Sequence, residues 1–182
     1  ATRVGADGLI EKGRENLLLQ SNNFDTTWVN ARSSETSGQS GYDGTNNAWL
    51  LSDVSSVNND HIIYNPNTHS GVVTYSVYAK ANTLNWIELK SYGGSTTINS
   101  FFDLENGVVG SGANIKANIE AIGNGWYRCS VTGYTATNNY VRIALANGNN
   151  SLDFVGTNGD NSIFIQDAQL EIGLAATEVI ES

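Results

Sequence analysis

The chain has 182 residues, of which 40% are hydrophobic and 15% charged, with 18 acidic residues against 9 basic ones and a formal net charge of −9. A chain of this length makes one domain and buries roughly 70% of its unfolded surface, so a disulfide is not required to stabilise a core. The acidic balance argues against nucleic acid, whose binding depends on neutralised phosphates, and the lack of an apolar run of about 18 residues argues against membrane insertion.

The first 14 residues, ATRVGADGLIEKGR, mix charges of both signs with glycines and show little hydrophobic periodicity. Such a composition is typical of a connecting segment. We therefore expect residues 1–14 to be a linker or leader from a larger protein and residues 15–182 to form the domain.

Short strands separated by polar turns are expected along the rest of the chain. Alternation is clearest over 72–80, where Val73, Tyr75 and Val77 share one face. Turn sequences at short intervals and the lack of a sustained helical period favour an all-β fold, an antiparallel two-sheet β-sandwich of about ten strands. The expected strands are 17–19, 48–51, 61–64, 72–80, 85–92, 98–104, 115–121, 126–134, 140–145 and 161–173, with a turn at 65–67 after the third.

The last of these strands changes the parity of its apolar residues near its centre. Ile163 and Ile165 have one parity, whereas Leu170 and Ile172 have the other, so one extra residue has been inserted. This pattern predicts a β-bulge that redirects Asp167. An acid at the centre of an apolar strand needs a partner, which we expect elsewhere in the fold.

Several segments of the chain occur in the order found in a known type of module. They are an opening Asn-Leu-Leu, an Asn-Phe-Asp turn, Trp28 and the closing FIQDAQLE strand. Together these resemble jelly-roll carbohydrate-binding modules found beside polysaccharide-degrading enzymes. A related module of phage tail and virion proteins and of marine bacterial surface proteins is similar in the segments VTYSVYAKA (73–81), FDLENGV (102–108), NGWYRCSV (124–131) and AQLEIGLAAT (168–177).

The resemblance implies a non-catalytic jelly-roll module that binds a polysaccharide or cell-surface glycan for a larger virion or secreted protein, outside the cell or on a virion. The competing hypothesis is a structural or oligomerisation module of a phage tail or virion protein, whose outward aromatic residues contact other subunits. A glycan-cleaving enzyme has less support, since His61 and His69 have no spacing that suggests a triad or a metal cluster.

A calcium site is also implied by the resemblance. Asn23, Asp25 and Asp167 match positions at or near the structural metal site of the resembling modules, so a Ca²⁺ ion would tie the first turn to the last strand. Ca²⁺ takes six to eight hard oxygen ligands. The alternative is that Asp25 only caps its turn and Asp167 is solvated at the bulge. Gln166 stands where many such modules have a second Asp, which removes one ligand.

A glycan site needs aromatic rings for the CH faces of sugars beside charged or amide side chains for their hydroxyls. The outward residues of two consecutive strands, 72–80 and 85–92, offer this combination, and two arginines share the outward parity of their own strands. These side chains form one platform if their strands share a sheet. The alternative is that loops or another subunit cover them. The expected ligand-binding residues are Tyr78, Lys80, Trp86, Glu88, Lys90, Tyr92, Arg128 and Arg142.

Overall fold

A computed structural model describes residues 2–4, 10–12, 14–93 and 96–180. Within these ranges the chain forms strands and turns, and no helix there is long and apolar enough to cross a membrane. The strands are β1 Thr2–Val4, β2 Ile10–Lys12, β3 Val29–Ala31, β4 Ser33–Gln39, β5 Ala48–Asp53, β6 Asn58–Asn59, β7 His61–Ala81, β8 Trp86–Gly93, β9 Thr96–Asp103, β10 Val108–Val109, β11 Lys116–Gly123, β12 Trp126–Ala146, β13 Phe154–Val155 and β14 Ser162–Ile172.

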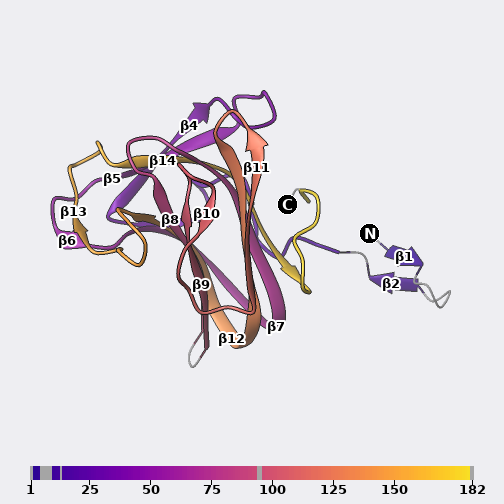
Figure 1. The fold of residues 1–182 in the computed structure, drawn as a ribbon. Helices are drawn as coiled ribbons and strands as arrows, with labels where there is room; N and C mark the ends of the chain where they lie inside the picture. Colours follow the sequence, from indigo (N-terminus) through magenta and orange to yellow (C-terminus); the bar gives the residue numbers. More distant parts are fainter. Residues whose placement is uncertain (1, 5–9, 13, 94–95, 181–182) are drawn as a thin grey trace.

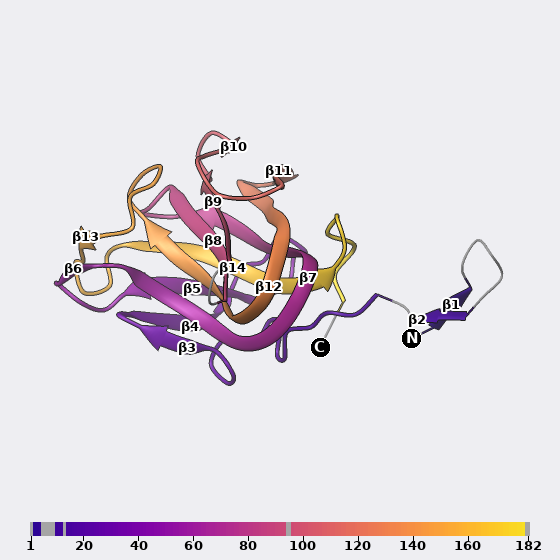
Figure 2. The ribbon, with the colours of Figure 1, turned by 90° about the horizontal axis from the view of Figure 1, so that it is seen from below.

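Ten strands form one continuous antiparallel sheet that folds over into two layers (Figures 1 and 2). The first layer has the order β4-β5-β14-β7-β12-β11 and uses the second half of β7 with the first half of β12. The second layer has the order β3-β7-β12-β8-β9-β10 and uses the other halves of these two strands. The predicted antiparallel two-sheet sandwich of about ten strands is therefore confirmed.

The two layers are joined because β7 and β12, each 21 residues long, stay paired with one another through a bend. At the bend the register shifts between Thr135 and Tyr140, and Gly71 on the opposite strand has a φ of +100°, which other residues rarely adopt. The prediction of four separate strands with a turn at 65–67 is wrong, since the backbone continues as strand across both bends.

The core lies between the layers and takes alternate side chains from each strand. Tyr75 is its largest fully buried side chain, and the opening segment adds Phe24 and Trp28, whose ring centroids are 4.8 Å apart. Each such aromatic or aliphatic side chain contributes about 1.5–3 kcal/mol when buried. The segment 17–19 is not the predicted strand. It is an irregular piece that bends at Leu18, buries that side chain and enters a turn at Leu19.

The bulge predicted in β14 is present. The register with β7 shifts around Asp167, whose φ of +49° is unusual for a residue with a side chain. Because of the extra residue, Ile165 before it and Leu170 after it are both fully buried in the same core. Ile172, expected on that face as well, is 57% exposed at the end of the strand.

The N-terminal segment forms a small hairpin of β1 and β2, which Figures 1 and 2 show apart from the sandwich. These two strands were not predicted. The remaining residues of the expected linker, 1, 5–9 and 13, lie outside the described part of the chain, and the domain boundary near residue 14 stays a prediction.

Candidate functional site

The eight residues predicted to bind a glycan lie on two faces of the molecule. The short connection 82–85 carries the chain from the first layer to the second, so the outward side chains of β7 and β8 do not share a sheet surface. The condition under which these residues would form a single platform is therefore not met. Tyr78, Lys80 and Arg128 lie on the outer face of the first layer, whereas Trp86, Glu88, Lys90, Tyr92 and Arg142 lie on the outer face of the second.

On the first layer, Tyr78 belongs to a packed aromatic cluster. Its ring stacks on that of Tyr42 with 3.8 Å between centroids, and the guanidinium of Arg128 lies 5.3 Å from its centre. Trp126 meets Tyr42 edge-on at 6.2 Å. Since only 8% of Tyr78 is exposed, little of its ring is available to a sugar.

The outer face of the second layer carries a row of three half-buried tyrosines. The ring centroid of Tyr140 is 5.5 Å from that of Tyr64 and 5.2 Å from that of Tyr92. The three residues come from β7, β12 and β8, which are neighbouring strands, and Tyr140 pairs directly with Tyr92. We call this surface, together with the charged residues beside it, the tyrosine face.

A set of ion pairs lies beside the tyrosines. Arg142 donates two hydrogen bonds to one oxygen of Glu88, from Nε at 2.9 Å and Nη2 at 2.7 Å, and a third to Asp60 at 3.3 Å. Arg32 pairs with the other oxygen of Asp60, and Asn99 donates to the second oxygen of Glu88 at 2.8 Å. Each carboxylate oxygen therefore has a donor from the protein, and the buried Arg142–Glu88 pair holds the surface rigid.

Lys90 is the third cation of this face. It lies opposite Arg142 across the β8–β12 pair, with its amino group 5.2 Å from the ring centre of Tyr92. Among the described residues it makes no ion pair and no side-chain hydrogen bond. Burial, and then the charge of Arg142, lower the pKa of Lys90, and the charges of Glu88 and Asp60 oppose this effect.

Trp86 stands at the edge of the tyrosine face and is half-buried. The loop after β10 crosses it so closely that a Cβ on Gly110 would come within 2.8 Å of its ring. The loop is held by a hydrogen bond from Gly110 to the carbonyl of Phe101 and by one from Ser111 to the side chain of Asn149, both 2.8 Å. Trp86 is thus partly covered and is not the centre of an open platform.

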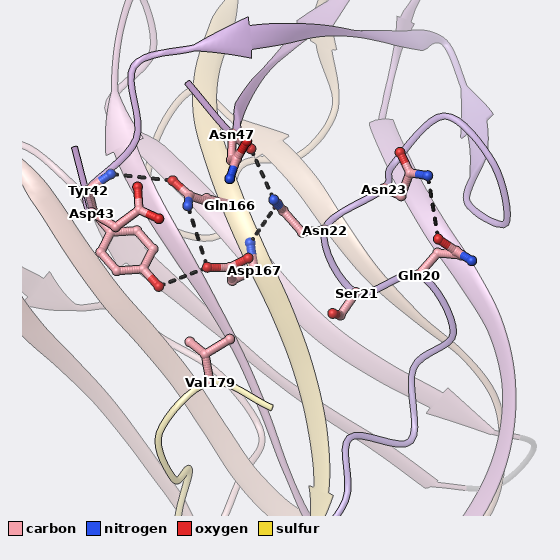
Figure 3. A pocket seen from close by; sticks show the side chains of 10 residues that line it. All are labelled: Gln20, Ser21, Asn22, Asn23, Tyr42, Asp43, Asn47, Gln166, Asp167 and Val179. Atoms are coloured by element: carbon pink, nitrogen blue, oxygen red, sulfur yellow. Dashed lines mark hydrogen bonds between the residues drawn. The ribbon is translucent and has the colours of Figure 1, made fainter. Parts of the chain in front are cut away.

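A separate pocket of about 530 Å³ opens over the bulge in β14 (Figure 3). The Asp167 carboxylate accepts a hydrogen bond from the Tyr42 hydroxyl at 2.8 Å. The backbone N–H of Asp167 donates to the side-chain oxygen of Asn22 at 3.0 Å. The buried Gln166 accepts from the backbone N–H of Tyr42 at 3.3 Å. We call this the amide pocket, and its lining residues are Gln20, Ser21, Asn22, Asn23, Tyr42, Asp43, Asn47, Gln166, Asp167 and Val179.

Two groups in the amide pocket have shifted acidities. Burial, reinforced by the hydrogen bond to Asp167, raises the pKa of Tyr42 far above its ordinary value. Burial acts in the same upward direction on Asp43, but hydrogen bonds from Thr45 outweigh it and hold the pKa of that carboxyl below its usual value. Near neutral pH the pocket therefore presents a phenol donor and at least one carboxylate acceptor.

The predicted calcium ligands are only partly brought together. Asn23 and Asp167 line the amide pocket, whereas Asp25 is exposed and is not part of its lining. In the part of the chain that the structure describes, no three carboxylate, imidazole or thiol groups are placed to hold one metal ion. The pocket still offers the hard oxygens that Ca²⁺ prefers, from Asp43, Asp167 and several side-chain amides.

No protein-family model matches the chain, and neither does any curated protein sequence. Among solved structures, the CBM22-1–GH10 modules of Clostridium thermocellum xylanase 10B, complexed with xylohexaose, are 14% identical with a TM-score of 0.49. That likeness covers 91% of this chain and 29% of the other. TmCBM61 in complex with β-1,4-galactotriose is 12% identical with a TM-score of 0.46, over 86% of this chain and 97% of the other.

The enzymatically active domain of bacteriophage CBA120 tailspike protein 4 is 13% identical with a TM-score of 0.46, over 86% of this chain and 21% of the other. This chain thus spans less than a third of the xylanase and tailspike chains that it resembles. At these identities and TM-scores the likenesses assign neither a family nor a ligand.

Sequence reasoning missed several residues of the tyrosine face. Tyr140 has the same outward parity as Arg142, so the alternation pattern could have identified it as a member of this face. The pairing of β7 with β3 and β12 brings Tyr64, Arg32 and Asp60 to the tyrosine face. The spacing of these three residues in the sequence does not indicate that pairing.

Proposed function

We propose that this chain is a carbohydrate-binding module whose tyrosine face recognises a polysaccharide or cell-surface glycan without cleaving it. The observation that carries the proposal is the row of Tyr64, Tyr140 and Tyr92 beside the rigid Arg142–Glu88 pair. Sugars stack their CH faces on aromatic rings, and their hydroxyls bond to charged groups of fixed geometry. A row across three strands suits a chain of sugars better than a single one.

The chemistry of the face supports binding without hydrolysis. A glycosidase needs a carboxylic acid that donates a proton and a second carboxylate as base or nucleophile. Asp60 and Glu88 both accept hydrogen bonds from arginine, so neither is placed to donate a proton. His61 is fully buried with its ring nitrogens at backbone carbonyls, and burial lowers the pKa of His69 to about 4.

Binding to a panel of neutral and acidic polysaccharides, with Tyr140→Ala beside the wild type, tests this proposal. Loss of one stacking partner costs on the order of 1 kcal/mol, so we expect the variant to bind roughly five- to tenfold more weakly. Tyr134→Ala is the matched control, because Tyr134 is a tyrosine of the same strand that is 60% exposed away from the row. Tyr92→Ala replaces Tyr140→Ala if the latter does not fold. No binding by folded wild-type protein to any polysaccharide overturns the proposal.

A structural role in a virion or fibre is the second candidate, and a different surface favours it. Ile115 and Tyr134, each 60% exposed, line a hollow of about 260 Å³ with Ile98. Exposed apolar side chains gathered in this way mark protein contacts. Light scattering tests this role. An oligomer that Ile115→Asn dissociates, and Tyr140→Ala does not, would favour it, and either role places the chain outside the cell or on a virion.

We also propose that the amide pocket binds Ca²⁺, with Asp167 and Asp43 as its charged ligands and Asn23 among the neutral ones. Affinity for Ca²⁺ depends on the number of charged ligands. Two carboxylates support a dissociation constant on the order of 10⁻⁴–10⁻³ M, the range of extracellular modules. The ion would then fasten the turn around residue 22 to the bulge of β14, where Asn22 and Asp167 already meet.

A further inference from the structure

We infer that the glycan bound by the tyrosine face is anionic, and that the ammonium group of Lys90 recognises its carboxylate or sulfate groups. This inference rests on the proposed function and narrows it to one class of polysaccharide. It comes from the balance of charges on the face and from the position of one lysine at the end of the tyrosine row.

The cations of the tyrosine face outnumber its carboxylates. Around Lys90, the three cations Arg32, Lys90 and Arg142 stand against two carboxylates, Asp60 and Glu88, in a protein whose net charge is −9. A further carboxylate of this layer, Asp103, lies at the other edge beside Trp86 and accepts hydrogen bonds from Glu105 and Asn106. A neutral sugar requires no such excess. An anion does require it, because the rest of an acidic protein repels a polyanion.

The excess charge is located on Lys90. Every oxygen of the two carboxylates already accepts a hydrogen bond from an arginine or from Asn99, and neither carboxylate makes an ion pair with Lys90, on which their charges act only from a distance. Lys90 is half-buried, and within the described ranges its three N–H donors have no protein acceptor. The ammonium group lies over the ring of Tyr92 and keeps access to solvent, so an anionic ligand can reach it.

The position of Lys90 matches a ligand that lies along the tyrosines. Its amino group is 5.2 Å from the ring centre of Tyr92, and Tyr92 is stacked with Tyr140 at 5.2 Å. A sugar that lies along the tyrosine row next to Tyr92 would therefore place its substituents beside the ammonium group, which itself lies over the Tyr92 ring. Arg142 lies directly across the strand pair from Lys90, and Glu88, two residues earlier on β8, holds it in place, so the two side chains limit the directions that the lysine can take.

The test compares a polyuronate with the same polysaccharide after chemical reduction of its carboxylates to alcohols, by calorimetry in the presence of EDTA. EDTA prevents calcium ions from bridging an acidic polymer to an acidic protein. A sulfated polysaccharide beside its desulfated form makes a second arm and distinguishes sulfate from carboxylate as the preferred anion. We expect the anionic form of one pair to bind at least tenfold more tightly than its neutral counterpart.

Three variants assign that preference to Lys90. Lys90→Met keeps the length of the side chain and should abolish the preference while leaving the weaker binding of the neutral polymer, whereas Lys90→Arg should retain it. Lys80→Met on the first layer is the matched control and should behave as wild type. Equal binding of anionic and neutral polymers, or a preference that survives in Lys90→Met, overturns the inference alone. Failure of folded wild-type protein to bind any of the polymers overturns the proposed function and this inference with it.

Discussion

The Tyr42 hydroxyl donates a hydrogen bond of 2.8 Å to the carboxylate of Asp167, a residue 125 positions further along the chain. This contact connects the loop after β4 to the bulge in β14. The ring of Tyr42 also stacks on Tyr78, so the loop is fixed over the outer face of the first layer at two points. The bulge thus serves the fold as an anchor for a distant loop, and the partner that an acid in mid-strand requires is a phenol.

Replacing Tyr42 with phenylalanine should lower the free energy of unfolding by about 1–2 kcal/mol, because Asp167 loses its phenol donor in a partly buried site. Denaturant unfolding measures the change. Tyr134→Phe is the control, since that tyrosine is 60% exposed, and its stability should stay within about 0.5 kcal/mol of wild type. Equal stability of the two variants would show that the Tyr42–Asp167 contact contributes nothing.

Glu88→Ala should be far more destabilising, by about 3–5 kcal/mol, because it leaves the buried guanidinium of Arg142 without its main partner. Glu120→Ala, at an exposed position of β11, provides the comparison. Replacing both members of the pair, by Glu88→Leu with Arg142→Met, should recover much of the loss, since it removes the unpaired charge. If the double variant were no more stable than Glu88→Ala, lost packing would be the better explanation.

Alternation along single strands was enough to predict the class of fold. The parity change around Asp167 also identified the bulge, because a side-chain period of two makes one inserted residue visible. The alternation does not show which strands are neighbours in the sheet. Tyr78 and Lys90 have the same outward character in consecutive strands, yet the chain crosses between layers at 82–85 and places them on opposite faces.

The composition of the candidate sites depends on long-range strand pairing even more than the arrangement of the layers does. Lys90 and Arg142 meet because β8 pairs with β12, and Asp60 reaches Arg142 from the start of β7. The bend that keeps β7 continuous through Pro66 was mistaken for a turn, because proline and asparagine are the residues that turns prefer. Single-sequence reasoning therefore found five members of the second-layer surface without finding what holds them together.

Asp53 should make stability depend on pH in the acid range. It is fully buried, which raises its pKa, but backbone N–H groups of Thr157, Gly159 and Asn161 donate to it and the net effect lowers the pKa below 3.8. Because the folded pKa is the lower one, this stabilisation is complete above the unfolded value of about 3.9 and is lost as the pH falls through the folded value.

The variant Asp53→Asn should consequently unfold at lower denaturant concentration at pH 7, with a loss of about 1.5–3 kcal/mol. Its difference from wild type should shrink as the pH is lowered below about 4. Unfolding curves at a series of pH values measure both effects. A difference that is the same at pH 7 and at pH 3 would contradict the proposed role of the charge.

Removal of calcium should lower the melting temperature if the amide pocket holds the ion. With a dissociation constant near 1 mM, about 10 mM Ca²⁺ would stabilise the fold by about 1.4 kcal/mol, or roughly 3–5 °C. Scanning calorimetry with Ca²⁺ and then with EDTA measures this shift. Asp167→Asn should abolish it and Asp25→Asn should not, because Asp25 does not line the pocket. A melting temperature that does not respond to Ca²⁺ would contradict the proposed binding of the ion in the amide pocket.

Alkaline pH should weaken binding of an anionic glycan through Lys90. Burial and the nearby Arg142 lower the pKa of this lysine from its ordinary 10.5, and only its protonated form attracts an anion. Affinity should therefore be complete below the folded pKa and fall as the pH rises through it, at a lower pH than a fully solvated lysine would give.

Tyr140 does not obscure this transition, because burial raises the pKa of its phenol. Lys90→Arg should hold its affinity over the same range, since arginine keeps its proton. Calorimetric titrations between pH 7 and pH 10 with wild type and Lys90→Arg measure the difference, and parallel losses in the two proteins would assign the effect to another group.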